Sequence, residues 1–203
     1  MNGADSTQST TMVSIKHAQT QYPVADLIRK RWSARAFSPR ALTQLEINTI
    51  LEAANWAPSA LNEQPWRYIV ALKQNEEGFQ QLLSYLNPGN AAWAQHAAAL
   101  VFSYAKTTYT RNQQPNINAL HDTGMANQNL LLQAISMNIY SHVMEGFDKR
   151  KISTDFNLAE DEQAVVMIAL GHLGDAAVLD EPFRSREATP RSRKELGEFV
   201  KEL

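Results

Sequence analysis

The chain has 203 residues, 44% of them hydrophobic, and a formal net charge of -2 at pH 7. This length suits one sizeable domain with its own core, or a domain with a small appendage, and we expect a single domain over residues 23–203. The lack of cysteine excludes disulfides, iron–sulfur ligation and thiolate catalysis. The slightly acidic balance argues against nucleic acid as the main partner, because nucleic-acid binding usually calls for a basic domain.

The amino-terminal segment is polar and rich in serine and threonine, and it lacks the apolar core of a secretory signal. No apolar run reaches the length of a membrane span, so no membrane partner is expected. We expect residues 1–22 to form a disordered leader. The absence of cysteine fits a reducing compartment, and the missing signals favour a cytoplasmic location.

Residues 41–57 are predicted to form the clearest helix. Thr43 followed by Glu46 makes a capping box, which satisfies backbone N–H groups of the first turn. Apolar side chains recur at helical spacing along it: Leu45, Ile47, Ile50, Leu51 and Ala54. Pro58 then ends the helix, because the residue before a proline is pushed out of the helical region.

A strand over residues 67–72 follows Pro65, as the run of Tyr, Ile and Val indicates. Further along the chain the pattern predicts helices over 76–86 and 91–98 and an apolar strand over 99–105.

The stretch 107–122 is polar and contains Pro115, which indicates a long loop. Asp122 is expected to cap a helix over 123–138, whose small or apolar residues on several faces predict deep burial. The sequence therefore places a mobile polar segment directly before a buried helix.

Strands are predicted over 139–144 and 164–174, with a break at 145–148 between the first strand and the rest of the chain. After Pro182 the tail is rich in Arg, Ser and Pro, and residues 196–203 form either a short helix or an extended arm. The alternation of helices and strands, without repeats, predicts a mixed α and β domain.

Basic residues gather in two short segments at opposite ends of the sequence. One comprises Arg29, Lys30, Arg31, Arg35 and Arg40, and the other Arg184, Arg186, Arg191, Arg193 and Lys194. Two such clusters in a slightly acidic protein can converge on one small polyanion such as a phosphate. The alternative is two solvated surfaces.

Several common site patterns are missing. The eight glycines never approach the spacing of a dinucleotide-binding or phosphate-binding loop. The five histidines show no metal-ligand spacing, and His121 beside Asp122 is better explained by a helix cap. A trio of Ser59, His142 and Asp148 lacks a nucleophile elbow. No metal site and no hydrolase triad are therefore expected.

The stretch between Trp56 and Ala71 has an unusual density of polar residues for a helix-to-strand connection. Ser59, Asn62 and Gln64 lie between two prolines that fix its ends, so their hydrogen-bonding groups sit on a loop held by two rigid elements. A polar turn that satisfies its own backbone is the alternative.

Four segments together resemble the nitroreductase-like family of flavoproteins. They are RKRWSARAF (29–37), APSALNEQPWRY (57–68), VMEGFD (143–148) and TPRSR (189–193). They are similar to the family's arginine-x-serine-x-arginine start, its proline-serine and asparagine-x-glutamine-proline-tryptophan loop, its glutamate-glycine-phenylalanine turn and its closing basic pair. The order and spacing of all four make the resemblance specific.

The resemblance implies an α+β sandwich with a mostly antiparallel central sheet, helices on both faces and an intertwined homodimer that binds flavin mononucleotide (FMN) at its interface. Arg31, Ser33 and Arg35 would reach the FMN phosphate, and Arg191 and Arg193 would close on it. Trp32 would contribute mainly its backbone. Several guanidinium groups can hold a dianionic phosphate in the absence of a glycine-rich loop.

At the other end of the cofactor, the resemblance implies that Asn62 faces the flavin ring of its own subunit. Four neighbouring residues would lie against the flavin held mainly by the other subunit: Pro58, Ser59, Ala60 and Leu61. Glu145 and Gly146 would direct a backbone N–H at flavin N5. Trp56 and Trp66 are expected to be packing residues.

The implied activity is a ping-pong reaction in which NADH or NADPH reduces the flavin and a nitroaromatic, a quinone or a similar small acceptor oxidises it. No side chain is assigned as acid or base, and the loop at 107–118 is expected to flank the pocket with Tyr109 and Asn116 near the substrate. Alternatives on the same scaffold are a dehalogenase, a flavin-cleaving enzyme, an enoate or aldehyde reductase, and a non-catalytic FMN carrier.

Overall fold

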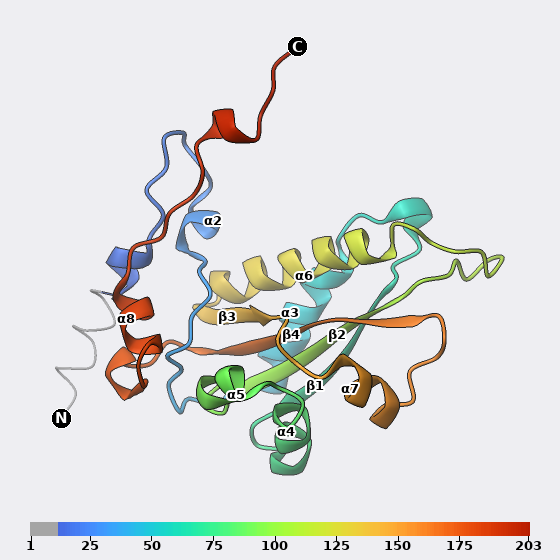
Figure 1. Ribbon diagram of the computed structural model, residues 1–203, viewed down its shortest axis with the longest axis horizontal. Helices are drawn as coiled ribbons and strands as arrows, with labels where there is room; N and C mark the ends of the chain where they lie inside the picture. Colours follow the sequence, from blue (N-terminus) through green and yellow to red (C-terminus); the bar gives the residue numbers. More distant parts are fainter. Residues whose placement is uncertain (1–11) are drawn as a thin grey trace.

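The computed structural model describes residues 12–203 and is built on one four-stranded sheet (Figure 1). Its strands are β1 (Trp66–Leu72), β2 (Ala99–Lys106), β3 (Ile139–Met144) and β4 (Glu162–His172). The order across the sheet is β1-β2-β4-β3, and every neighbouring pair is antiparallel.

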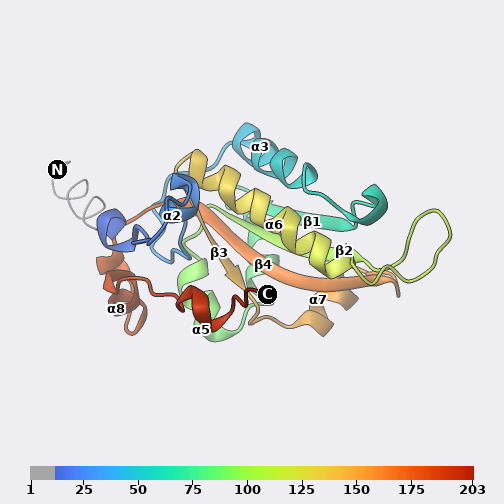
Figure 2. The same ribbon diagram turned by 90° about the horizontal axis from the view of Figure 1, so that it is seen from above.

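Helices cover both faces of this sheet, as Figure 2 shows from above. One face carries α3 (Gln44–Asn55) and α6 (Ala119–Ser136). The other carries α4 (Glu76–Leu83), α5 (Pro88–Ala94) and α7 (Lys149–Asp155). The α+β class with a central antiparallel sheet, expected from the sequence, is confirmed.

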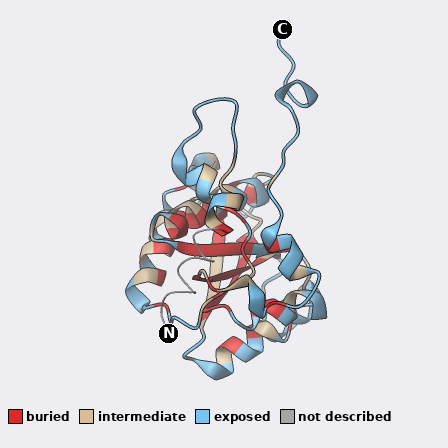
Figure 3. Cartoon of the chain, turned by 90° about the vertical axis from the view of Figure 1, so that its left-hand side faces the viewer, coloured by how far each residue is buried: buried red, intermediate tan, exposed pale blue. Residues whose placement is uncertain are grey.

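Strands β2 and β4 carry long apolar runs because both faces of the sheet are buried there (Figure 3). In β2, Ala99 and Val101 pack with α3 and α6, whereas Leu100 and Phe102 pack with α4, α5 and α7. Side chains alternate across a strand, so a strand covered on both sides needs apolar residues at every position. This accounts for the unbroken apolar runs in β2 and β4.

The capping box of α3 is confirmed. The Thr43 side chain accepts a bond from the Glu46 N–H (3.2 Å), and the Glu46 carboxylate accepts one from the Thr43 N–H (2.7 Å). The predicted apolar stripe is wrong at Leu45, which is 75% exposed. Leu45 lies about 160° around the helix from the buried Ile47, since each residue turns the helix by about 100°.

Helix α6 begins at Ala119, with Asn118 at its N-cap, so the prediction that Asp122 caps it is wrong. Asp122 lies within the first turn and is 2% exposed. Its carboxylate bonds a distant loop instead, which local sequence spacing cannot reveal.

Residues 1–11 of the expected leader lie outside the described residues. Residues 12–16 are helical, and Met12 and Lys16 are both 7% exposed, so these five residues differ from the expected disordered leader. The reason is tertiary: Lys16 donates hydrogen bonds to backbone carbonyls near the carboxyl end.

The remaining elements are short. They are α2 (Asp26–Lys30), η1 (Ala60–Asn62), η2 (Ala176–Val178), α8 (Phe183–Ala188) and η3 (Leu196–Glu198). Beyond α8 the chain runs away from the body as an arm with one short helical turn, η3 (Figures 1 and 3). Among residues 12–203, no helix combines the length and apolarity needed to cross a membrane.

Candidate functional site

The segment after α2 runs along the outer edge of β3. Ser33 forms a parallel bridge with Ser141, and Phe37 forms an antiparallel bridge with Leu173 just after β4. Side chains alternate along this extended segment: Trp32 is buried, whereas Ser33 is exposed. The sheet edge therefore presents the Ser33 hydroxyl to the outside.

Trp32 serves to pack this segment. Its ring centroid lies 4.6 Å from that of Tyr140, and its side chain is 3% exposed. Only its backbone can face a ligand beside Ser33.

The structure brings the two basic clusters together. The Arg191 guanidinium donates to the carbonyl of Arg29 (2.6 Å) and to that of Arg31. Burial lowers the pKa of Arg31, and Arg193 lowers it further; burial, Arg31 and Arg193 likewise lower the pKa of Arg191. The two basic segments therefore meet where Arg191 contacts residues 29–31.

Three of these guanidinium groups have no carboxylate partner. Within residues 12–203, no salt bridge joins an Asp or Glu to Arg31, Arg191 or Arg193, while Arg35 pairs with Glu187. Uncompensated cations held close together suit a dianion such as a phosphate. The donor set at this edge therefore fits the phosphate end of FMN.

Arg35 differs from the role expected for it. One of its terminal nitrogens lies 3.6 Å from Glu187, and its guanidinium sits 5.8 Å from the Trp93 ring and 5.9 Å from the Phe183 ring. These contacts turn the side chain into the protein, away from a solvent-facing anion. The sequence motif placed Arg35 correctly on the segment but could not show its internal partner.

Glu187 was missed by the sequence reasoning. It is 0% exposed and accepts hydrogen bonds from the Trp32 indole N–H (3.3 Å) and from the Arg35 backbone N–H (3.1 Å). Burial raises its pKa, and Trp32, Lys16 and Arg35 act in the opposite direction. A glutamate between the arginines of residues 184–193 was the available signal.

Glu145 and Gly146 follow directly after β3, farther along the same edge. The Gly146 carbonyl accepts bonds from the Asn87 N–H and the Asn90 side-chain amide, both 3.1 Å. A Cβ on Gly146 would lie 2.2 Å from the Asn87 amide nitrogen, so only glycine fits unless Asn87 moves. The four residue-to-residue steps from Ser141 to Glu145 span about 13 Å, so this edge suits an elongated ligand.

His142 lies between these two points. Its Nδ1 is 3.1 Å from the Ala34 carbonyl, and its ring centroid is 4.5 Å from that of Trp93. Burial and the nearby Arg35 lower its pKa to about 4. The imidazole is therefore neutral near pH 7 and adds no charge to the edge.

The loop after α3 has a special backbone. Leu61 (φ 56°), Asn62 (φ 54°) and Gln64 (φ 53°) all adopt the left-handed region, which disfavours side chains such as leucine. Ser59 Oγ accepts from the Gln64 N–H (3.0 Å), and Asp122 accepts from the Ala60 N–H (2.9 Å). These bonds hold the loop so that Pro58, Leu61 and Asn62 remain exposed.

A second loop, residues 107–118, is tied to this one. The Glu63 carboxylate accepts from the Thr110 N–H (2.7 Å) and the Thr110 hydroxyl (2.5 Å). Tyr109, a predicted substrate contact, is half-buried with the Arg111 guanidinium 5.6 Å from its ring. The two loops therefore form one surface.

Asn116, the other predicted substrate contact, is only 3% exposed. Its side-chain oxygen accepts from the Asn118 N–H (3.1 Å), and its own N–H bonds the Thr107 carbonyl (2.7 Å). It therefore shapes the turn into α6 and lies below the surface.

The two tryptophans expected to pack behave differently. Trp66 is 6% exposed and belongs to the core under α3 and α6. Trp56 is 78% exposed, and its indole N–H donates to Glu52 (3.0 Å), so the packing prediction is wrong for this chain's own core.

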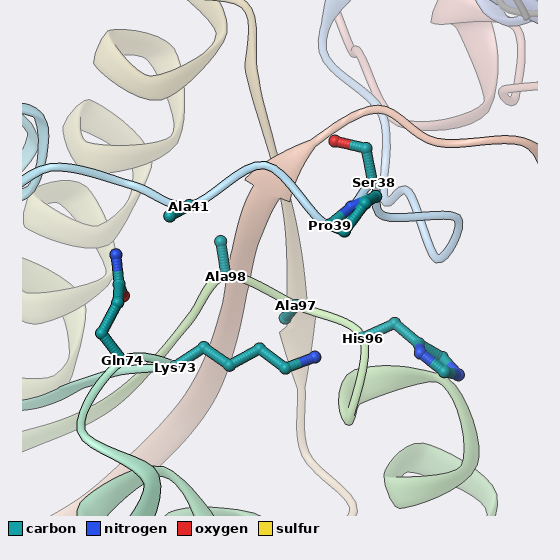
Figure 4. A pocket seen from close by; sticks show the side chains of 8 residues that line it. All are labelled: Ser38, Pro39, Ala41, Lys73, Gln74, His96, Ala97 and Ala98. Carbon is teal, nitrogen blue, oxygen red and sulfur yellow. The ribbon is translucent and has the colours of Figure 1, made fainter.

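The candidate residues thus form two groups at opposite ends of the molecule. Figures 1 and 2 show α2 and α8 at one end and the 107–118 loop projecting at the other. A hollow of about 180 Å³ lies elsewhere, between residues 38–41 and residues 96–98 (Figure 4). This hollow is smaller than the roughly 300–1,000 Å³ typical of ligand pockets, and no predicted site residue lines it. The described part of the chain also holds no group of three His, Cys, Asp or Glu side chains placed to bind a metal.

Comparisons with known proteins identify the family and the fold. The nitroreductase family model matches residues 28–97 and 71–172. A solved structure described as an oxidoreductase containing FMN is 32% identical, with a TM-score of 0.86, over 91% of this chain and 93% of its own. A protein from Desulfovibrio desulfuricans, described as a nitroreductase in complex with FMN, is 25% identical with a TM-score of 0.69 over 91% of this chain and 98% of its own.

Among curated proteins, the oxygen-insensitive NAD(P)H nitroreductase of Salmonella typhimurium is 26% identical over 73% of this chain and 88% of its own length. The match to the family model spans well over half of the chain. With the antiparallel sheet, the paired arginine segments and the left-handed loop, these likenesses establish that the chain belongs to the nitroreductase family.

Proposed function

We propose that this protein is an FMN-dependent oxidoreductase that takes hydride from NADH or NADPH and passes electrons to a nitroaromatic, a quinone or a related small acceptor. The observation that carries the proposal is the group of uncompensated cations, Arg31, Arg191 and Arg193, on the sheet edge that ends at Glu145 and Gly146. The names of the FMN-containing relatives and of the NAD(P)H nitroreductase support it.

The chain's own groups would bind and orient the cofactor. Arg31, Arg193 and the Ser33 hydroxyl would hold the phosphate, and Arg191 would support them by fixing the Arg29 and Arg31 carbonyls. The backbone at Glu145 and Gly146 would face the ring. When bound, FMN supplies the hydride chemistry, and the protein supplies orientation and electrostatics.

No side chain is assigned as a proton donor or acceptor. Glu145 is exposed and its carboxylate bonds Lys149 (2.6 Å), while His142 is neutral and bonded to the backbone. The residues at the edge are therefore proposed to bind and orient the cofactor.

The site is proposed to be completed by a second copy of the chain. The loop that carries Pro58 to Asn62 lies at the far end of the molecule from the arginines, so one chain cannot readily close both groups on one ligand. We therefore propose that Asn62, expected from the sequence to face the flavin of its own subunit, faces the flavin of the partner together with Pro58 to Leu61. Exposed apolar side chains near that loop suit a subunit interface: Leu61 is 66% exposed and Ile117 90%. The arm adds Phe199, which is 65% exposed. We propose a homodimer with composite FMN sites in the cytoplasm.

Anaerobic mixing with NADH or NADPH tests the proposal. An enzyme of this kind binds added FMN, and the flavin absorbance near its visible maximum bleaches and returns when an acceptor is added. A carrier would bind FMN without bleaching, and a dehalogenase or other reductase on this scaffold would bleach but respond to a different acceptor. Protein that takes up no FMN would overturn the proposal as a whole.

A further inference from the structure

A buried cluster of charges lies directly beneath the arginine segments. We call it the Glu187 clamp: it consists of Glu187, Lys16, Arg35 and Trp32. The carboxylate is 0% exposed and bonds both Trp32 and Arg35. These two residues lie on either side of the exposed Ser33 in the sequence, and the carboxylate contacts them from the protein interior. One side chain thus sets the position of the whole 32–35 segment.

Lys16 extends the clamp to the other side of Glu187. Its ammonium group is part of a residue only 7% exposed, and it donates to the carbonyls of Arg186 (2.6 Å) and Thr189 (2.7 Å). These carbonyls bracket Glu187 in the chain. Lys16 therefore fixes the tail on both sides of the carboxylate.

The clamp acts where several cations repel one another. Arg31 and Arg193 each lower the pKa of a neighbouring guanidinium group, so the cations oppose their own assembly. Arg191, four residues after Glu187, bonds only backbone carbonyls of the 29–31 segment. A buried anion tied to both segments can hold them together before any ligand arrives.

We infer that Glu187 is a positioning residue that preorganises the anion site by holding segment 31–35 against residues 187–193, with Lys16 as its support. The inference rests on the proposed FMN phosphate site. It adds a residue that does not touch the cofactor and that the family motifs do not contain.

Charge and geometry predict opposite effects on phosphate binding when this carboxylate is removed. By Coulomb's law alone, removing a negative charge beside several cations should strengthen binding of a phosphate. Loss of the clamp should weaken it, because the arginines are no longer held in place. Glu187→Gln preserves the shape of the side chain but turns an NH₂ group toward one of the two donors, so it breaks the clamp with little change in volume.

The experiment measures dissociation constants of FMN and riboflavin for the wild type and Glu187→Gln by quenching of flavin fluorescence. We expect FMN to bind about tenfold more weakly or worse, and riboflavin, which lacks the phosphate, to change by less than about twofold. Glu202→Gln is the matched control, since it removes the same charge from the exposed end of the same tail and should match the wild type. Unchanged or tighter FMN binding, or an equal loss for riboflavin, would overturn the inference.

A flavin-free measurement separates this inference from the proposed function. In the apoprotein, loss of the clamp should speed tryptic cleavage in residues 187–193 relative to the wild type, whereas cleavage at an equal rate would contradict the clamp. If Glu187→Gln does not fold, Lys16→Met should show the same faster tryptic cleavage, and cleavage at the wild-type rate would contradict the clamp. Wild-type protein that binds neither flavin would reject the proposed function while the cleavage comparison still decides on the clamp.

Discussion

His142 illustrates how far one buried side chain can control the response to pH. Its folded-state pKa of about 4 lies below the ordinary value of 6.5, so the unfolded chain takes up the proton first as pH falls. Stability should therefore fall between about pH 6.5 and about pH 4, by about 3 kcal/mol at most.

The variant His142→Asn should lose this part of the pH dependence, because asparagine can still donate to Ala34 but does not titrate. Free energies of urea unfolding measured across that range are the test. His96→Asn, at an exposed position, should keep the wild-type slope. A slope for His142→Asn equal to that of the wild type would show that His142 is not the group responsible.

Arg31 and Arg193 are expected to share one phosphate. Arg31→Ala and Arg193→Ala should each weaken FMN binding by roughly 1.5 to 3 kcal/mol, the usual value of a charge-assisted hydrogen bond, and should barely affect riboflavin. The double variant should depart from the sum of the two, because both side chains contact one dianion. Arg150→Ala, exposed on α7, is the control, and clean additivity would mean that the arginines act at separate places.

At this scale the sequence predicted some roles and missed others for a clear reason. Motif spacing predicted that Arg31, Ser33, Arg191 and Arg193 belong together, and the structure brings their segments into contact. It could not predict that Arg35 turns inward, because its partner Glu187 lies 152 residues away. Only tertiary packing decides that the Arg35 side chain is turned toward Glu187.

The loop of residues 58–65 is held by a hydrogen bond to Asp122 on α6, a contact that no local sequence pattern predicts. Asp122→Ala would leave the Ala60 N–H without its acceptor and should cost about 1 to 3 kcal/mol of stability. Because the loop is proposed to contact the flavin ring, FMN and riboflavin should weaken equally, unlike the arginine variants.

The control is His121→Ala, which removes only the exposed partner of Asp122 and should bind both flavins as the wild type does. Thermal unfolding of the apoproteins measures the stability term, and fluorescence titration measures the binding term. A loss confined to FMN would contradict the assignment of this loop to the ring.

The elements themselves were largely predictable because their signals are local. The capping box at Thr43 and the two apolar strands needed no knowledge of distant residues. The start of α6 was misplaced because Asp122 looked like a cap by spacing, whereas its carboxylate serves the loop at Ala60. The order in the leader was missed because Lys16 is held by the carboxyl-terminal tail.

For the whole molecule, the proposed dimer makes Ile117 a sensitive position. The side chain is 90% exposed, so Ile117→Asp should leave the isolated chain stable but place a charge within the proposed interface. We expect sedimentation velocity to show a shift from dimer to monomer together with weaker FMN binding. Asn112→Asp adds the same charge to the same exposed loop and should sediment as the wild type; identical behaviour of both variants would place Ile117 outside the interface.

The separation of the two groups of residues to opposite ends of one chain has a genetic consequence. In the proposed dimer, each pocket takes its arginines from one chain and its left-handed loop from the other. Two alleles damaged at opposite ends would then complement each other, because a mixed dimer concentrates both lesions in one pocket and leaves the second intact. Two alleles damaged at the same end would not.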